Sequence, residues 1–548
     1  LAQVEHMDYL AAQEIPKVEM SYSELEKKEI FRRYLESVLQ KKFAEHYTED
    51  IATISLVGFG SLASGFGMPG SDMDLALMPQ WKDPSISHDI AIDRNIPRLL
   101  ERAVLDAKLG GRLLTRTRVP ILKICQSPTE TLYTALFEER KKWDELPEEE
   151  KYPVEPASEP TVAPKSLDLA DVGKSMQVAT ESPKLTEDFP ALGTTAPGGT
   201  PRTKAATKSS TPSDAVKAAP PNSSEKSDAA NNNTNPTNKD QQTRPEPKWM
   251  REKILGPLDF PKTGVGIQCD VNFDNPLGIH NTHLLRCYSM TDPRVQPIIL
   301  FVKAWAKRRK INSSYSGTLS SYGWVLMVLH YLVNVAQPRV CPNLQLSAPN
   351  PTNLASLQDA FQGTMIAGYN VRFWDNEKEI HEAAQAGQLS QNRQSVGALL
   401  RGFFQYFASS GYEYGVRPPQ FYWTTEVLSL RTPGGIQTKQ AKGWVSATTK
   451  ITAEKKVTNR YLFAIEDPFE IDHNVARTVT HRGIVAIRDE FRRTWRILRA
   501  IGQGAQPEGG IFDDVVEEVP PPTPKTKVKD EPKTVASNDS SVAVPQGT

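Results

Sequence analysis

Hydrophobic and polar positions in the first part of the chain repeat with two different periods. Over residues 21–47, apolar side chains recur every three or four positions, which predicts an amphipathic helix. Short apolar runs at 52–58, 74–78 and 119–125 predict three strands, and the polar-faced stretch 94–109 predicts a helix between the last two. This alternation indicates a small mixed sheet with helices beside it. The apolar positions of the first helix are Leu25, Ile30, Tyr34, Leu35 and Leu39.

A second set of patterns begins near Trp249. Residues 265–273 predict a further strand, which would belong to the same sheet as the first three. Helical spacing then dominates, so we expect an α+β chain in which a mostly helical domain follows the sheet. The clearest helical stretches are 297–310, 321–335, 396–409 and 485–500.

The composition changes between these two ordered parts. From 127 to 246, Pro, Ser, Thr, Lys, Ala and Asn dominate, and aromatic residues nearly vanish after Tyr152. Such a segment cannot bury enough apolar area to offset the entropy lost on ordering, which predicts a disordered insertion. The same composition returns after Gly502. The predicted organisation is a split first domain at 21–126 and 247–280, the insertion at 127–246, a helical domain at 281–502 and a disordered tail at 503–548.

Overall charge and cysteine usage exclude few classes of function. Lys plus Arg and Asp plus Glu each number 65 in 548 residues, so only local clusters can argue for nucleic acid. The four cysteines form no CxxC pair and no histidine lies in an HExxH frame, so neither a zinc module nor a disulfide framework is indicated. The longest apolar stretch, 325–336, is too short to span a bilayer. Because the first residue is Leu1, we expect the native start to precede it.

Two carboxylates, Asp72 and Asp74, follow the pair Gly60 and Ser61 after ten intervening residues. Side chains at i and i+2 of a strand point to the same face, so these carboxylates could hold the same cations. Two Mg²⁺ ions roughly 3.5–4 Å apart stabilise the attacking and the leaving oxygen of an in-line phosphoryl displacement. Asp270, an acid inside an apolar strand pattern, would complete the site, because a buried charge is costly unless a cation meets it.

A solvated turn is the alternative interpretation of the acid pair. The metal site is favoured by the apolar residues around both acids and by the turn at Gly60 and Ser61, whose amides and hydroxyl can hold phosphate oxygens. Residues 65–70 also match GxGxxG, which marks a dinucleotide site when it opens a helix directly after a strand. Here it leads through Pro69 into a strand, so we reject that reading.

Six ordered motifs resemble those of terminal uridylyltransferases and atypical poly(A) polymerases, over roughly 21–500 without the insertion. They are VGFGS at 57–61, SDMDL at 71–75, NT with LL at 281–285, VKAWAK at 302–307, LSSY at 319–322 and IEDPFE at 465–470. The resemblance implies a DNA polymerase beta-type nucleotidyltransferase domain, split by the insertion, and a helical poly(A) polymerase-associated domain, with the nucleotide in the cleft between them.

The activity implied by this resemblance is template-independent addition of ribonucleotides to RNA 3′ ends, with UMP and CMP favoured, which marks RNA for turnover. A fungal subgroup that tags messages with mixed C and U tails fits within it. An atypical poly(A) polymerase and a small-molecule or oligonucleotide nucleotidyltransferase remain alternatives. Asp72, Asp74 and Asp270 would hold two Mg²⁺ or Mn²⁺ ions, and Asp270 would also align or deprotonate the RNA 3′ hydroxyl.

The other motifs suit nucleotide contacts. Lys303 and Lys307 lie four residues apart on one helix face and could hold the β and γ phosphates, although a solvated basic face is the alternative. Asn281 could bind the ribose hydroxyls and Ser321 a phosphate. Tyr322 could stack on the base, and a plain core position is its alternative.

Base choice would rest on His473, which occupies the place of a histidine that distinguishes uracil from adenine in uridylyltransferases. An imidazole can donate to a pyrimidine carbonyl and fills space that a purine needs, whereas the alternative is a histidine that only packs the loop. The neighbouring Asp472 could raise the imidazole pKa or accept from an amine and so admit cytosine. We expect UTP or CTP as substrate, with ATP use left open.

The sequence indicates RNA-binding residues less clearly than nucleotide-binding ones. A basic stripe that only faces solvent is an equal alternative for the same arginines. The candidate RNA-binding side chains are Arg308, Arg309, Arg477, Arg492 and Arg496. Without a separate RNA-recognition module, target choice would depend on RNA-decay proteins bound through the disordered segments. The expected location is cytoplasmic, with the nucleus left open and no membrane partner.

Overall fold

The computed structural model describes residues 1–83, 92–115, 120–151, 249–251, 255–273, 275–348, 365–409, 418–451 and 456–515. All of these residues belong to one unit of the chain.

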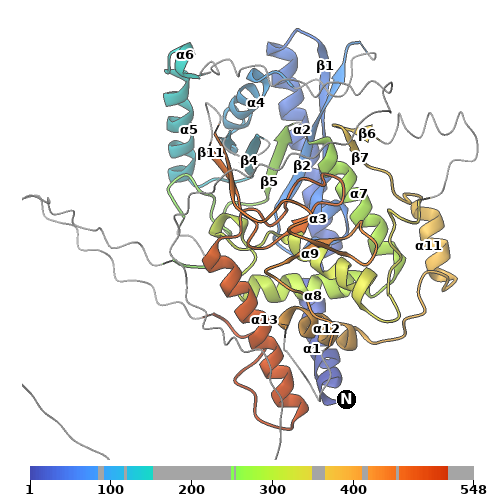
Figure 1. Ribbon diagram of the computed structural model, residues 1–548. Helices are drawn as coiled ribbons and strands as arrows, with labels where there is room; N and C mark the ends of the chain where they lie inside the picture. The colour runs from blue at the N-terminus through green and yellow to red at the C-terminus, as the bar shows by residue number, and fades with distance from the viewer. Residues whose placement is uncertain are drawn as a thin grey trace, which may run out of the picture. The chain divides into compact units, whose positions relative to one another are not determined.

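A five-stranded mixed sheet carries the acidic residues of interest (Figure 1). Its strand order is β1-β2-β5-β4-β3; β2 and β5 run parallel, and the other neighbours are antiparallel. The strand after the long interruption therefore belongs to the same sheet, as predicted, and the structure places it between two strands that precede it. The strands are β1 (Ile51–Phe59), β2 (Met73–Trp81), β3 (Gly110–Leu114), β4 (Ile121–Cys125) and β5 (Gln268–Phe273).

Two helices, α2 (Tyr22–His46) and α4 (Asn95–Asp106), pack against this sheet and share one hydrophobic core with it. The Ser21 side chain caps α2 by accepting a hydrogen bond from the Glu24 amide, which is a helix-start signal. The helix buries Phe31, Leu35, Leu39 and Phe43. The predicted apolar face was partly wrong, because Leu25, Ile30 and Tyr34 are 39%, 62% and 47% exposed.

The predicted disorder is wrong for the start of the insertion. Helices α5 (Glu130–Asp144) and α6 (Glu148–Lys151) lie there, and Leu132 and Leu136 of α5 are buried. Their spacing of four places both on one face, so a helix with many charges still has an apolar stripe. This stripe packs against Leu105, Cys125, Phe260 and Val265. Residues 152–246 of the predicted insertion lie outside the described part of the chain.

Most of the remaining helices share a second, larger core. Trp305 is fully buried in it, with its ring centroid 5.6 Å from that of Trp324, 4.9 Å from that of Phe404 and 5.1 Å from that of Phe491. The predicted helices are confirmed here with small shifts of their ends. The helices are α7 (Pro276–Thr291), α8 (Val295–Arg308), α9 (Ser321–His330) continuing as the π-helix η2 (Tyr331–Val335), α11 (Glu377–Gln385), α12 (Val396–Ala408) and α13 (His481–Gly502).

Two helices depart from the predicted domain plan. Helix α1 (Ala2–Val18), which the sequence did not predict, packs in this second core through Met7, Ala11 and Ile15. The boundary predicted between residues 280 and 281 falls inside α7, so one continuous helix connects the sheet to the helical part.

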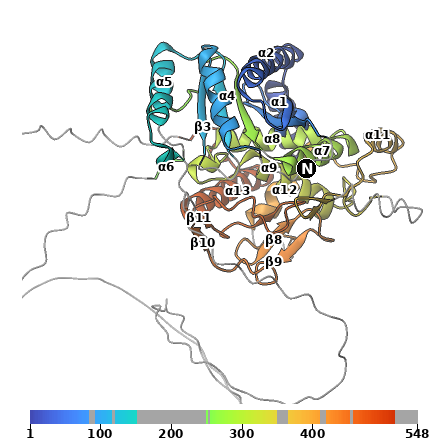
Figure 2. The same cartoon turned by 90° about the horizontal axis from the view of Figure 1, so that it is seen from above.

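Short strands complete the helical part. A three-stranded sheet has the order β12-β8-β9, and in Figure 2 helices α8 and α9 lie between α2 and strands β8 and β9. Strand β12 leads into the loop that contains His473. The remaining elements are α3 (Gly60–Ala63), η1 (Ser314–Ser316), β6 (Met365–Ile366), β7 (Tyr369–Asn370), β8 (Glu426–Ser429), β9 (Ile436–Thr438), β10 (Thr448–Ile451), β11 (Lys456–Asn459) and β12 (Ile465–Glu466).

The start of the predicted disordered tail also packs. Ile511 is buried, and the ring of Phe512 lies 5.0 Å edge-on from that of Phe301 in α8. The prediction of disorder over 503–548 is therefore wrong up to residue 515, because two apolar side chains in this polar segment pack against the helical core. The rest of the predicted tail lies outside the described residues. Among the described helices, none combines the length and apolar character needed to cross a bilayer.

Candidate active site

The strand pairing brings the three predicted carboxylates together. Asp74 in β2 is the direct Cα partner of Asp270 in β5, and Asp72 immediately precedes β2. Burial and the negative charges of Asp270 and Asp72 raise the pKa of Asp74 to about 7. Burial also raises the pKa of Asp72. This concentration of negative charge on oxygen donors fits a divalent cation such as Mg²⁺.

The Gly-Ser turn packs directly on this cluster. Gly60 begins α3 immediately after β1 with φ +71°, and its amide donates to Thr282 Oγ1 of α7 at 2.8 Å. A Cβ at Gly60 would lie 2.2 Å from Asp74 Oδ2, so glycine is required both for the backbone conformation and for this close approach. The turn containing Ser61 is thereby held against the carboxylates from one side and against α7 from the other.

Lys123 is a site residue that sequence reasoning missed. It lies in β4 opposite Asp270, and its Nζ is 2.8 and 3.0 Å from the two oxygens of that carboxylate. Burial acts to lower the pKa of Lys123, but the charges of Asp270, Asp72 and Asp74 outweigh it and the pKa is raised. The available signal was a lysine inside an apolar strand, which is costly unless an acid meets it.

The two predicted phosphate-binding lysines differ in their surroundings. Lys303 is 3% exposed and its ammonium donates to the Phe66 carbonyl, whereas Lys307 is exposed one turn further along α8. Burial lowers the pKa of Lys303 to about 8, although the nearby Asp74 acts to raise it. The structure thus ties Lys303 to the loop after the Gly-Ser turn and leaves Lys307 open to solvent.

A second constellation forms around Asp467, which lies buried just after β12. Its carboxylate accepts from the Tyr322 hydroxyl at 3.0 Å and from the Asn281 amide at 3.3 Å. It also accepts the backbone N–H groups of Phe469 and Glu470, at 2.9 and 3.0 Å. Asp467 therefore positions two predicted nucleotide contacts from α7 and α9. It appeared in a recognised motif, but its partners could be identified only from the folded chain.

Backbone and side-chain hydrogen bonds together hold the loop that carries His473. The His473 amide donates to the Glu470 carbonyl at 2.8 Å, and the His473 carbonyl accepts from the Asp467 amide at 3.2 Å. The carboxylate of Asp472 accepts from the Tyr369 hydroxyl at 2.6 Å. Asp472 is thus anchored by a tyrosine from β7.

Ser321 lies at the start of α9 and hydrogen-bonds Asn312, with its Oγ 3.0 Å from Asn312 Nδ2. A phosphate contact by Ser321 stays a prediction.

The structure corrects part of the predicted RNA-binding set. Arg309 is 6% exposed and pairs with Glu490 at 2.8 Å, so it serves the core and cannot reach a backbone phosphate. Arg308, Arg492 and Arg496 are exposed but paired with acids, namely Asp514 at 2.8 Å, Asp489 at 3.2 Å and Glu508 at 3.0 Å. Arg477 is half-buried, and its amide donates to the Asn474 carbonyl. An RNA role for these four arginines stays a prediction.

Two family models match parts of the chain. The model described as Cid1 family poly A polymerase matches residues 395–473. The model described as the central palm domain of mitochondrial-like poly(A) RNA polymerase matches residues 11–133 and 258–290. The second match spans the sheet, α2 and the Gly-Ser turn, and the first includes His473.

The curated relatives with similar sequences are also named as RNA nucleotidyltransferases. The chain is 42% identical over 269 residues to the terminal uridylyltransferase cid1 of Schizosaccharomyces pombe, which is 49% of this chain and 58% of that protein. It is 33% identical over 260 residues to the poly(A) RNA polymerase GLD2-B of Xenopus laevis, covering 46% of this chain and 41% of that protein. The matched regions thus span roughly half the length of these relatives.

Solved structures of Cid1 are similar to this structure. One, described in terms of RNA terminal uridylyl transferase activity, has a TM-score of 0.54 and 26% identity and covers 94% of this chain and 100% of its own. Another, in complex with the UTP analogue UMPNPP, has a TM-score of 0.53 and 26% identity and covers 93% of this chain and 99% of its own. Over these matched regions the chain is similar to terminal RNA nucleotidyltransferases such as the terminal uridylyltransferase cid1 and the GLD2 poly(A) RNA polymerases.

Proposed function

We propose that this protein adds ribonucleotides one at a time to RNA 3′ ends without a template, with UTP and CTP favoured, and that the tail marks the RNA for turnover. The observation that carries the proposal is the register of β2 and β5, which places Asp74 beside Asp270 with Asp72 adjacent. The Gly-Ser turn packs on the same cluster, and the constellation around Asp467 presents Asn281 and Tyr322.

Asp72, Asp74 and Asp270 would hold Mg²⁺, which when bound supplies positive charge to the attacking and leaving oxygens. Related Cid1 structures with MgGTP and with Mg 3′-dATP support this choice of ion. By the family resemblance, Asp270 would orient the RNA 3′ hydroxyl and accept its proton. Lys123 holds the Asp270 carboxylate in place through both oxygens.

The nucleotide would lie between the Gly-Ser turn and the Asp467 constellation. Lys307, exposed on α8, would neutralise the phosphates of the leaving pyrophosphate. Lys303 would act by holding the loop at Phe66 in place. Asn281 would meet the ribose, and Tyr322, with its hydroxyl fixed by Asp467, would offer its ring to the base.

A gel assay of primer extension tests the proposal. A short RNA primer is incubated with each nucleoside triphosphate in turn, with magnesium, with manganese and with EDTA. Stepwise extension with UTP or CTP that EDTA abolishes supports the proposal. Extension with ATP alone would favour a poly(A) polymerase, in line with the GLD2 relatives. Absence of extension with all four triphosphates would contradict both.

His473→Asn is expected to shift incorporation toward ATP, with the UTP to ATP ratio of kcat/KM falling about 10-fold, the scale of a single contact in a base pocket. A Cid1 structure described as revealing UTP selectivity carries a histidine-to-asparagine substitution with MgATP bound. The measurement is kcat/KM for the four triphosphates on one primer. His381→Asn, an exposed histidine in α11, is the matched control. An unchanged four-nucleotide profile in His473→Asn would refute the specificity role.

Asp74→Asn is expected to increase the free energy of unfolding at pH 8 in EDTA by about 1–3 kcal/mol. The folded-state pKa of about 7 lies above the ordinary 3.8, so the contribution of Asp74 to stability is largest below pH 4 and is lost as the pH rises through 7. The gain in the variant should therefore disappear at pH 4. Urea unfolding at the two pH values measures it, and a variant less stable than the native protein at pH 8 in EDTA would contradict it.

A further inference from the structure

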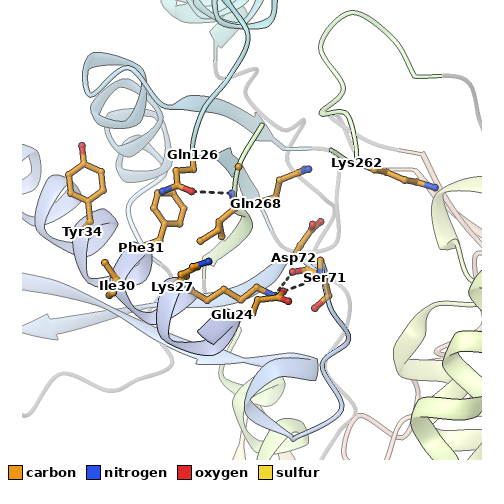
Figure 3. A pocket seen from close by; sticks show the side chains of 14 residues that line it. Glu24, Lys27, Ile30, Phe31, Tyr34, Ser71, Asp72, Gln126, Lys262 and Gln268 are labelled. Atoms are coloured by element: carbon orange, nitrogen blue, oxygen red, sulfur yellow. Dashed lines mark hydrogen bonds and ion pairs between the residues drawn. The ribbon is translucent and has the colours of Figure 1, made fainter. Parts of the chain in front are cut away.

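A cavity of about 690 Å³ opens beside Asp72, on the side of the sheet where α2 runs (Figure 3). Its wall is formed by the first half of α2, by Ser71 and Asp72 before β2, and by the start of β5 with Lys262 nearby. Cavities of roughly 300–1,000 Å³ hold small ligands or their polymer ends. The cavity thus reaches Asp72, a proposed metal ligand, without involving the Asp467 constellation.

The residues of the Asp467 constellation do not line this cavity. Asn281, Tyr322 and Asp467 are absent from its lining, whereas Asp72 contributes to it. In an in-line displacement the attacking oxygen and the leaving pyrophosphate stand on opposite sides of the phosphorus. A triphosphate held by the Gly-Ser turn and α8 therefore requires the attacking hydroxyl to arrive from a different side of the carboxylates. This cavity provides such an approach.

The lining has the chemistry of a site for single-stranded nucleic acid. Lys27, Ile30, Phe31 and Tyr34 are spaced so that they share one face of α2. Ile30 and Tyr34 are 62% and 47% exposed, although their apolar groups predicted a buried face. An exposed aromatic ring beside a lysine can stack on a base while the ammonium meets the adjoining phosphate.

The part of the lining next to Asp72 is polar. The Ser71 hydroxyl is buried and has no hydrogen-bond partner in the described part of the chain. The Ser71 carbonyl accepts from Lys28 at 2.8 Å, and Lys28 pairs with Glu24 at 2.9 Å, so the segment before Asp72 is fixed to α2. In Figure 3 the Tyr34 ring stands on one side of the cavity and Asp72 and Lys262 on the other, with Lys27 between them.

We propose that this cavity holds the 3′-terminal nucleotides of the RNA acceptor, with a base against Tyr34 and Ile30, phosphates near Lys27 and Lys262, and the terminal hydroxyl directed toward Asp72. The proposal rests on the function proposed above and assigns its acceptor site. It differs from the predicted arginine contacts, which lie on α8, on α13 and in the loop after β12.

Steady-state kinetics with a short RNA and UTP test the assignment. Tyr34→Ala is expected to raise KM for RNA about five-fold, the lower end of the effect of one stacked base, without raising KM for UTP. Lys27→Ala and Lys262→Ala should each weaken RNA binding. Each should also reduce the slope of log KM for RNA against log salt concentration by about 0.7, the value for one phosphate contact to a single strand. Tyr22→Ala and Lys41→Ala, exposed positions of α2 outside the cavity, are the matched controls and should change neither KM.

Fluorescence anisotropy with the same labelled RNA, in EDTA and without nucleotide, measures binding independently of transfer. Weaker binding by Tyr34→Ala and Lys27→Ala, but not by the controls, supports the acceptor site even if no extension occurs, in which case only the proposed function fails. Unchanged RNA affinity in both variants would overturn the assignment. An effect confined to KM for UTP would also overturn it, because the cavity would then belong to the incoming nucleotide.

Discussion

Replacing Asp72, Asp74 or Asp270 by asparagine is expected to reduce nucleotidyl transfer about 100- to 1,000-fold or more, the range for loss of one preorganised electrostatic group. Each change keeps the shape of the side chain and removes one negative charge from a cluster that burial already strains, as the raised pKa of Asp74 shows. Because Asp74 and Asp270 are direct partners across β2 and β5, the loss of either should weaken the binding of the same cations.

Primer extension at several magnesium concentrations provides the measurement. Part of the lost activity should return at higher magnesium if the remaining carboxylates still bind the ion weakly. Asp106→Asn, at the solvent-exposed end of α4, is the control and should retain the native rate. Circular dichroism and urea unfolding establish that each variant is folded. Extension near the native rate by any one of the three variants would remove that residue from the proposed site.

Two overlapping deletions, which differ by whether residues 128–152 are removed, should have opposite outcomes. Removing residues 128–246 is expected to abolish soluble, folded protein, whereas removing residues 153–246 and joining the ends by a flexible linker should preserve folding and primer extension. The shorter deletion spares α5. The longer one removes Leu132 and Leu136 from a core that contains Phe260 and Val265. Each large buried apolar side chain contributes about 2–5 kcal/mol, out of a total stability of about 5–15 kcal/mol.

An ion pair adds to the difference. Arg140 of α5 lies 3.2 Å from the buried carboxylate of Glu101 in α4, and the longer deletion leaves that carboxylate with Arg98 as its remaining arginine partner. Soluble yield, circular dichroism and RNA extension of both deletion variants provide the comparison. The double variant Leu132→Ala, Leu136→Ala in the full chain tests the cause, and it should lower the midpoint of urea unfolding. A folded, active 128–246 deletion would show that α5 contributes little to the core.

Local patterns determined much of the catalytic part from sequence alone. The spacing of Asp72 and Asp74 needs only the two-residue period of a strand, and Asp270 is identified by a charge in an apolar run. Strands β1, β2, β4 and β5 and helices α2, α4, α8, α9, α12 and α13 follow from periodicity in the same way, whereas β3 and α7 were not predicted. The six motifs indicated a resemblance to a family. Their order can be read along the chain without knowing how the chain folds.

Tertiary structure decided which of these residues meet and which face of each element is used. The pairing of β4 with β5 places Lys123 against Asp270, and the meeting of α7, α9 and the loop after β12 places Asn281 and Tyr322 on Asp467. Sequence spacing cannot predict such contacts between distant segments.

The same limit explains the errors. Arg309 was predicted to be a surface cation, but it is buried and paired with Glu490 of α13. Helix α5 was predicted to be disordered, but Leu132 and Leu136 pack with Leu105, Cys125, Phe260 and Val265. Periodicity shows that a helix has an apolar stripe, but the long-range contacts of the folded chain determine whether that stripe is buried, as in α5, or left exposed, as at Tyr34 of α2.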